Sequence, residues 1–138
     1  MQELFKKHAN KLRFGIVGII NTGLDFGILF FLTLLFNLPR ELANTISTTI
    51  SFLFSFVANK KYTFKSTSKN LKRQFILFAV VTLFGLWVVQ NGIISVATPL
   101  FMNIISNEAM SLFASKIIAT FASLIWNYIL YVKIIFTD

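Results

Sequence analysis

The sequence predicts an all-α membrane protein with four transmembrane helices, and three observations support that prediction. Of its 138 residues, 56% are hydrophobic and 17 are phenylalanine, more than the core of a small water-soluble domain readily buries. Only 13% are charged, about half the share of an average soluble domain. Long apolar stretches alternate with short basic ones, so lipid is the expected solvent of most side chains.

The expected helices follow from the bilayer, whose hydrocarbon core of about 30 Å needs roughly 20 apolar residues in helix. Three stretches meet this length: 14–36, 75–97 and 110–132. A fourth, 43–59, is shorter and more polar, and we expect it to cross because its polar residues fall mainly on one face.

Two prolines and one amphipathic stretch mark expected helix ends. Pro39 should follow the first span and Pro99 the third, because proline removes a helix hydrogen bond. Residues 1–14 place apolar side chains near one face, with lysines elsewhere. They should form a short separate helix in the cytoplasmic interface.

The connections predict the orientation. The stretch after the second span carries six basic residues and no acid, and the N-terminal stretch is also basic. The outer connections carry only Arg40 and Glu41 in the first, and Glu108 in the second. Because basic connections remain cytoplasmic, both termini and the central connection are expected there. We expect a single domain over residues 1–138 that crosses the membrane several times.

The two predicted hairpins resemble each other in sequence. "SFLFSFVANKKYTF" (51–64) aligns with "SLIWNYILYVKIIF" (123–136), with Lys61 on Lys133 and Phe64 on Phe136. Since each hairpin would begin and end in the cytoplasm, the repeat would be parallel, with its axis along the membrane normal. Chance similarity in a biased composition is the alternative.

Nucleic-acid binding and catalysis are both disfavoured. The net charge of +8 is gathered between apolar runs that are too long for a DNA-binding domain. There is no cysteine, and a single histidine is more readily an interfacial residue than a metal ligand. No phosphate-binding loop and no nucleophile with a partnered base is present. We expect no enzyme activity, no cofactor and no metal.

Polar residues form stripes on several spans. The second span carries one stripe: Asn44, Ser47, Ser51, Ser55 and Asn59. The fourth span carries another: Lys116, Thr120, Ser123 and Asn127. On the first span, Asn21 (or Thr22) shares a face with Asp25. Helix packing, which Gly23 and Gly27 would also serve, and contact with a substrate are both open explanations.

Asp25 and Lys116 are charges expected inside the membrane. Asp25 lies about 16 Å above the start of its span and Lys116 about 9 Å below the outer start of its own, so the two could meet. A structural ion pair or a snorkelling lysine is one interpretation. We favour a site in which Lys116 binds a phosphate and Asp25 balances its charge. Arg13, Lys60 and Lys61 would gather anionic headgroups at the cytoplasmic face.

The sequence resembles the GtrA-like family of small four-span membrane proteins. The resemblance is carried by "RFGIVGIINTGLDFGILFFL" (13–32), by "ANTISTTISFLFSFVANKKYTF" (43–64) with its N-K/R-x-x-x-F ending, and by Lys116 with the aromatic-basic end of the last span. By position, the family's inner-interface motif falls on Asn59, Lys60 and Phe64. The last span ends without a clean second motif, and the third span shows Gln90 and Asn91 where a basic residue is expected.

The resemblance implies a role in glycosylating bacterial surface polymers such as teichoic acid. A member would move a polyprenyl-phosphate-linked sugar, such as undecaprenyl-phosphate glucose, to the outer leaflet for a membrane glycosyltransferase. Membrane lipid, this substrate and the glycosyltransferase are the expected partners, with no nucleic acid. Ten residues are expected to contact substrate: Lys116, Asp25, Asn59, Lys60, Lys61, Arg13, Asn21, Asn127, Gln90 and Phe64.

Two other functions stay open. A small four-span drug or solute exporter would recognise cations through Asp25. A non-transporting scaffold for a membrane glycosyltransferase would depend on packing glycines such as Gly23. We also expect a homo-oligomer, because four short helices enclose little space.

Overall fold

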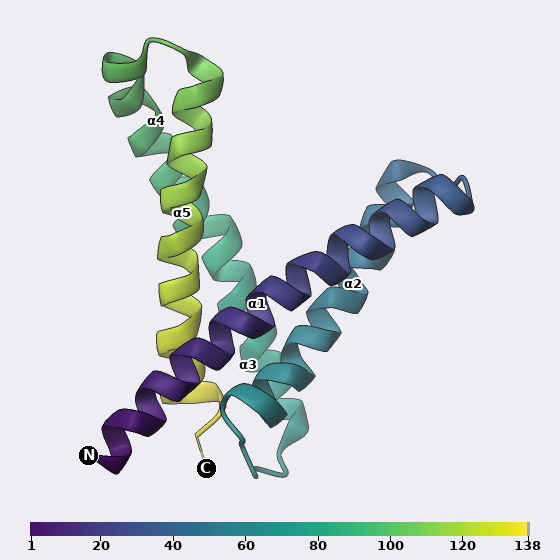
Figure 1. The fold of residues 1–138 in the computed structure, drawn as a ribbon, viewed down its shortest axis with the longest axis vertical. Coiled ribbons are helices and arrows are strands. Elements are labelled where there is room, and N and C mark those ends of the chain that lie inside the picture. The colour runs from purple at the N-terminus through teal and green to yellow at the C-terminus, as the bar shows by residue number, and fades with distance from the viewer. Residues whose placement is uncertain (138) are drawn as a thin grey trace. The chain divides into compact units, whose positions relative to one another are not determined.

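The computed structural model describes residues 1–137, apart from the side chains of Arg40 and Glu41. This part of the chain is helical and contains no strand. It forms two compact units, each a helical hairpin: unit 1 covers residues 1–67 and unit 2 covers residues 68–137 (Figure 1). The predicted all-α class with four long helical stretches is therefore confirmed.

Unit 1 consists of α1 (Gln2–Leu35), α2 (Arg40–Ala58) and the π-helical turn η1 (Asn59–Thr63). Helices α1 and α2 pack side by side (Figure 1). The chain reverses at Asn37, which takes a left-handed conformation with φ of 53°, and Pro39 then caps α2. Asparagine tolerates this conformation, so the predicted turn before Pro39 is confirmed.

The predicted separate interfacial helix is wrong. Helix α1 runs without a break from Gln2 to Leu35, through the expected boundary near residue 14. The first 14 residues contain no proline or glycine and are mostly good helix formers, so nothing in them ends a helix.

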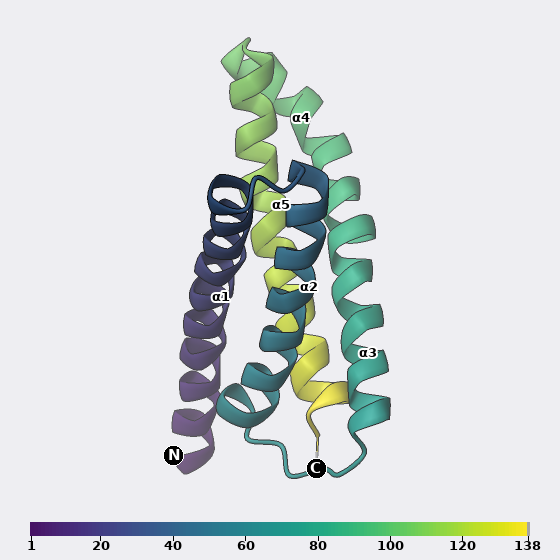
Figure 2. The ribbon, with the colours of Figure 1, turned by 90° about the vertical axis from the view of Figure 1, so that its right-hand side faces the viewer.

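Unit 2 consists of α3 (Leu71–Phe84), η2 (Gly85–Gln90), α4 (Asn91–Ile105), α5 (Glu108–Leu130) and η3 (Tyr131–Ile135). The first three run on from one to the next as a single long helix, residues 71–105. Figure 2 shows α4 beside α5, and the two pack together.

The predicted helix end at Pro99 is wrong, because Pro99 lies inside α4. A proline inside a helix removes one backbone bond, which membrane helices tolerate when neighbouring groups satisfy the backbone. The chain reverses only after α4 ends at Ile105. Ser106 is left-handed with φ of 54°, and the Asn107 side chain accepts a hydrogen bond from the Met110 backbone N–H at 3.1 Å.

The π-helical turns that end the two hairpins, η1 and η3, have the same local hydrogen bond. The Phe64 N–H donates to the Asn59 carbonyl at 2.9 Å after η1, and the Phe136 N–H donates to the Tyr131 carbonyl at 2.9 Å after η3. The alignment that pairs Lys61 with Lys133 also pairs these residues. This agreement supports the predicted pseudo-repeat, which as a relation between whole hairpins stays a prediction.

Three helical stretches of the described chain are long and apolar enough to cross a membrane: Gln2–Leu35, Leu71–Ile105 and Glu108–Ile135. Helix α2 does not meet this criterion, because serine, threonine and asparagine lower its hydropathy. Its buried residues include Ala43, Ser47 and Ser51, and α2 packs along α1. The predicted polar stripe is therefore buried at Ser47 and Ser51 but exposed at Asn44, and the crossing by α2 stays a prediction.

Candidate functional site

Unit 1 gathers buried polar residues where α2 passes into η1. Asn59 is 2% exposed, Thr63 is 0% exposed, and Lys60 is only 9% exposed. Lysine side chains are seldom buried to this extent. A π-turn has wider spacing than an α-helix, so residues four apart such as Asn59 and Thr63 share a face, and such turns often occur at functional sites.

Two oxygen atoms in this cluster, Asn59 Oδ1 and Thr63 Oγ1, are buried without a hydrogen-bond partner among the described residues. Asn59 Nδ2 does have partners, since it donates to the Ser55 carbonyl at 2.9 Å and to Ser55 Oγ at 3.2 Å. Buried polar atoms are normally paired, so the two oxygens mark a place suited to a polar ligand. Ser51 Oγ is a further buried atom without a partner in the described chain, but it lies eight residues earlier on α2.

Helix α1 contacts the same turn. The Arg13 guanidinium carbon lies 5.8 Å from the centroid of the Tyr62 ring, a cation–π distance. The Phe14 and Phe64 rings lie 6.4 Å apart. Arg13 thus lies beside η1 at the exposed Tyr62, and Phe64 follows η1 directly, whereas Lys61 is exposed.

Sequence reasoning missed Tyr62 and Thr63, which lie inside the N-K-K-Y-T-F segment. Thr63 had a usable signal, because it follows Asn59 by four residues, the spacing of a shared helix face. Tyr62 had none, since its role depends on where Arg13 of α1 is placed.

Asn21 and Asp25 form a second polar pair in unit 1. They lie four residues apart on α1, and each has a buried Oδ1 without a hydrogen-bond partner in the described chain. Thr22 differs, because its hydroxyl donates to the Gly18 carbonyl at 2.9 Å. Asn21 rather than Thr22 is therefore the available polar side chain on this part of α1.

Gly23 and Gly27 make no close contact within unit 1. Both are exposed, and a Cβ atom built on either meets nothing within 4 Å in the described chain. The buried residue of α1 is Val17. A packing role of these two glycines toward another helix pair or another copy of the chain stays a prediction.

The stripe predicted on the last span is divided in the structure. Ser123 and Asn127 are buried, but Lys116 and Thr120 are exposed. The buried stripe of α5 instead repeats every fourth residue: Ser111, Ser115, Ala119, Ser123 and Asn127. Each step of four residues turns an α-helix about 40° beyond a full turn, so the stripe winds around α5 and leaves Lys116 outside it.

Asn127 packs against η2, and its buried Oδ1 also has no hydrogen-bond partner among the described residues. A Cβ atom on Gly85 would lie 2.9 Å from Asn127 Oδ1 and 3.1 Å from Ser123 Oγ. Nearby, Trp126 Nε1 donates to the Val81 carbonyl at 3.2 Å, and the Thr82 and Tyr131 hydroxyls are hydrogen-bonded. Gly85 was missed from the sequence, where it is one glycine within an apolar span.

The remaining residues that were expected to contact substrate lie on different helices. Gln90 is half-buried at the end of η2, and Asn91 is exposed at the start of α4. Asp25 belongs to unit 1 and Lys116 to unit 2, and their pairing stays a prediction. No group of three His, Cys, Asp or Glu residues in the described part of the chain could hold a metal ion.

Comparison with known proteins gives a family. The model of the GtrA/DPMS transmembrane domain matches residues 13–136. The comparison with curated proteins gives no match, and neither does that with solved structures. The apolar helices and this transmembrane domain together show a multi-pass membrane protein. Because the match begins at Arg13 in α1 and ends at Phe136 after η3, it spans both hairpins, and the chain belongs to the GtrA/DPMS transmembrane domain family.

Proposed function

We propose that the chain moves a polyprenyl-phosphate-linked sugar from the inner to the outer leaflet of the bacterial cytoplasmic membrane. A membrane glycosyltransferase would then transfer the sugar to a surface polymer such as teichoic acid. The family fits membrane proteins of glycosylation pathways and is generally non-catalytic. The substrate combines a phosphate charge, a polar sugar and a long apolar tail, so a carrier needs a polar site that opens toward lipid.

The observation that carries the proposal is the buried polar cluster of η1. Lys60 supplies positive charge, and the Thr63 hydroxyl lacks a partner among the described residues. A hydroxyl can donate a hydrogen bond to a phosphate oxygen. Charge-assisted hydrogen bonds are about twice as strong as neutral ones, and shielding from water strengthens them further. The cluster therefore suits the phosphate of the lipid-linked sugar.

The acceptor pair on α1 suits the sugar. Asn21 and Asp25 present oxygen atoms without partners in the described chain, and sugar hydroxyls are donors to such atoms. Asn21 lies eight residues beyond Arg13, which is about 12 Å along the helix. The headgroup would move along the hairpin from η1 toward this pair.

The apolar tail would stay in lipid beside the exposed phenylalanines of α1. Phe26 and Phe30 are 55% and 56% exposed, and their rings stack at 6.3 Å. Lys116 is exposed on α5 and is proposed as a contact for the phosphate in the outer half of the membrane. A tail that remains in lipid avoids the cost of passing many apolar carbon atoms through a polar site.

Reconstitution into sealed vesicles tests the function directly. Vesicles would contain a polyprenyl-phosphate sugar, and an added enzyme that cannot cross the membrane would consume the sugar on the outer leaflet. The wild-type chain is expected to make the inner-leaflet half accessible, while protein-free vesicles retain it. If the inner half stays protected although the chain is folded and inserted, the chain is not a flippase.

The same vesicles distinguish the alternatives. A cation exporter would leave the lipid-linked sugar in place and move a cationic drug instead. A scaffold would move neither and would raise sugar transfer only when the glycosyltransferase is added. Only the flippase exposes the sugar in the absence of any other protein.

A further inference from the structure

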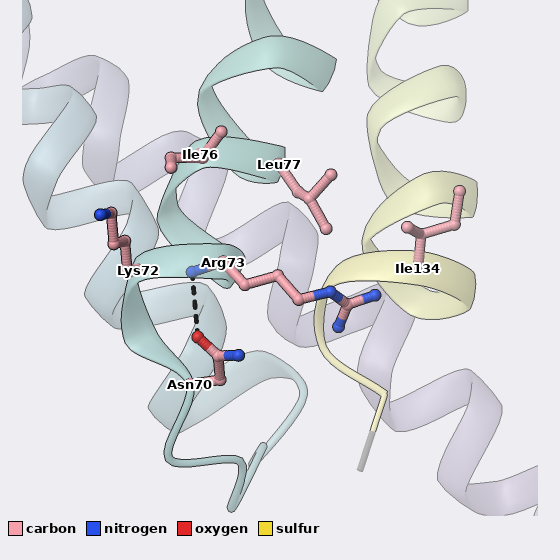
Figure 3. A pocket seen from close by; sticks show the side chains of 6 residues that line it. All are labelled: Asn70, Lys72, Arg73, Ile76, Leu77 and Ile134. Atoms are coloured by element: carbon pink, nitrogen blue, oxygen red, sulfur yellow. Dashed lines mark hydrogen bonds between the residues drawn. The ribbon is translucent and has the colours of Figure 1, made fainter.

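Unit 2 contains a groove that combines positive charge with apolar walls, where α3 begins beside η3 (Figure 3). Its volume is about 480 Å³. That lies in the range of small-ligand pockets, roughly 300–1,000 Å³. The residues that line it are Asn70, Lys72, Arg73, Ile76, Leu77 and Ile134.

The walls of this groove are held by specific hydrogen bonds. The Asn70 side chain caps α3 by accepting a bond from the Arg73 backbone N–H at 3.2 Å. Gln74, 1% exposed, donates its Nε2 to the Ile135 carbonyl at 3.1 Å and so joins α3 to η3. Figure 3 shows the Arg73 side chain extending from α3 toward Ile134. The guanidinium is thus placed between the two elements that form the groove.

The charge of the groove is not balanced by a described carboxylate of residues 1–137. Lys72 and Arg73 are exposed, and neither pairs with a carboxylate among the described residues. The same groove is apolar on its other sides, where Ile76, Leu77 and Ile134 line it. A ligand that satisfies both parts has an anionic head and an apolar tail.

We propose that this groove binds an anionic phospholipid of the cytoplasmic leaflet. The phosphate would lie at Arg73, and the first part of an acyl chain would lie against the isoleucine and leucine side chains. Lys72 leaves α3 on the other side and would add positive charge nearby (Figure 3). The guanidinium fork matches phosphate oxygens with two parallel hydrogen bonds. Basic pockets beside membrane helices on the cytoplasmic side commonly hold anionic headgroups.

This lipid site shares no residue with the proposed route of the sugar. None of its lining residues belongs to the η1 cluster or to the acceptor pair on α1, and all of them lie in unit 2. The bound lipid would be a constant component of the protein rather than its cargo. The inference therefore stands or falls independently of the flippase proposal.

A binding experiment on the full chain tests the inference. The purified protein in neutral detergent micelles would be titrated with short-chain phosphatidylglycerol, with phosphatidylcholine as the zwitterionic control. Arg73→Gln is expected to weaken phosphatidylglycerol binding about tenfold, the loss of one charge-assisted contact. Lys69→Gln removes the same charge just before α3, outside the groove, and should change binding less than about twofold.

Two further measurements in the same experiment identify the ligand. Ile134→Gln keeps every charge but makes one wall polar, and it should also weaken phosphatidylglycerol binding, whereas inorganic phosphate should not displace the lipid. Equal losses for Arg73→Gln and Lys69→Gln would overturn the inference, because binding would then be general electrostatic attraction. Displacement by inorganic phosphate, or one-for-one displacement by a polyprenyl phosphate, would overturn it as well.

Discussion

Thr63 has a hydroxyl that is fully buried and has no hydrogen-bond partner among the described residues. An unpaired buried hydroxyl costs free energy, which natural proteins tolerate chiefly where the group has a function. At the scale of single residues, this atom, with Asn59 Oδ1, is the clearest mark of a ligand site in unit 1.

Thr63→Val is expected to stabilise the chain and to impair sugar movement. Valine has the same shape without the hydroxyl, so the free energy of unfolding should rise by about 1 kcal/mol in the absence of substrate. Unfolding in detergent measures stability, and the vesicle assay measures movement. Thr49→Val is the matched control, since Thr49 is exposed and its hydroxyl already donates to the Thr45 carbonyl. A Thr63→Val chain that is both less stable and fully active would contradict this role.

Gly85→Ala is expected to destabilise unit 2 by about 1–3 kcal/mol, because added atoms in a tight core force neighbours to move. The new Cβ would lie within 3.1 Å of Ser123 Oγ and of Trp126 Cδ1, and closer still to Asn127. Gly92→Ala provides the control, since a Cβ there meets nothing within 4 Å. Thermal unfolding followed by circular dichroism compares the two variants, and equal stability would show that η2 and α5 are not tightly packed here.

At the scale of elements, hydropathy and turn residues predicted the four helical stretches, because length and apolarity decide which segments suit lipid. The break at Asn37 followed from local turn chemistry. Pro99 was misjudged, because a proline in a long membrane helix need not end it. The three π-turns were not predictable, since they leave no strong local pattern and depend on bonds between distant elements, such as that from Gln74 to Ile135.

The candidate site was predicted only in part for the same reason. The motif at the end of α2 located Asn59 and Lys60, which are buried together. The prediction that Lys116 shares a buried face with Ser123 and Asn127 was wrong. Residue spacings of three and four identify a shared helix face, but they do not show how the buried face winds around the helix. Burial depends on which helix packs alongside, and a single sequence does not contain that information.

Gln74→Leu is expected to lower the free energy of unfolding by about 1–3 kcal/mol, because it leaves the Ile135 carbonyl without its side-chain donor in a buried place. Gln74 joins the start of α3 to η3 through a bond of 3.1 Å. Denaturant unfolding in mixed micelles measures the change. Gln2→Leu, at an exposed position of α1, controls for the change in polarity. If both variants unfold alike, the Gln74 bond does not stabilise the hairpin.

At the scale of the whole molecule, the distribution of charge predicts the orientation. The connection between the units carries Lys65 and Lys69, both exposed, and Lys65 has a left-handed backbone with φ of 49°. Such an exposed and irregular connection is a good protease substrate. The positive-inside rule places it in the cytoplasm.

Trypsin is therefore expected to cut at Lys65 or Lys69 only when the cytoplasmic face is outward. Inside-out vesicles should give two fragments, which mass spectrometry identifies, while right-side-out vesicles keep the chain intact. Detergent-permeabilised vesicles control for protease activity. Cleavage at these lysines in sealed right-side-out vesicles would reverse the topology and with it the direction of transport.

The most direct test of the central claim compares Lys60→Gln with Lys61→Gln in the sealed-vesicle assay. The two variants remove the same charge from adjacent positions of η1, but Lys60 is buried and Lys61 is exposed. Loss of a charge-assisted contact to phosphate is expected to slow sugar movement at least tenfold for Lys60→Gln and less than about twofold for Lys61→Gln. Equal rates for the two variants, whether both fast or both slow, would contradict a phosphate site at Lys60.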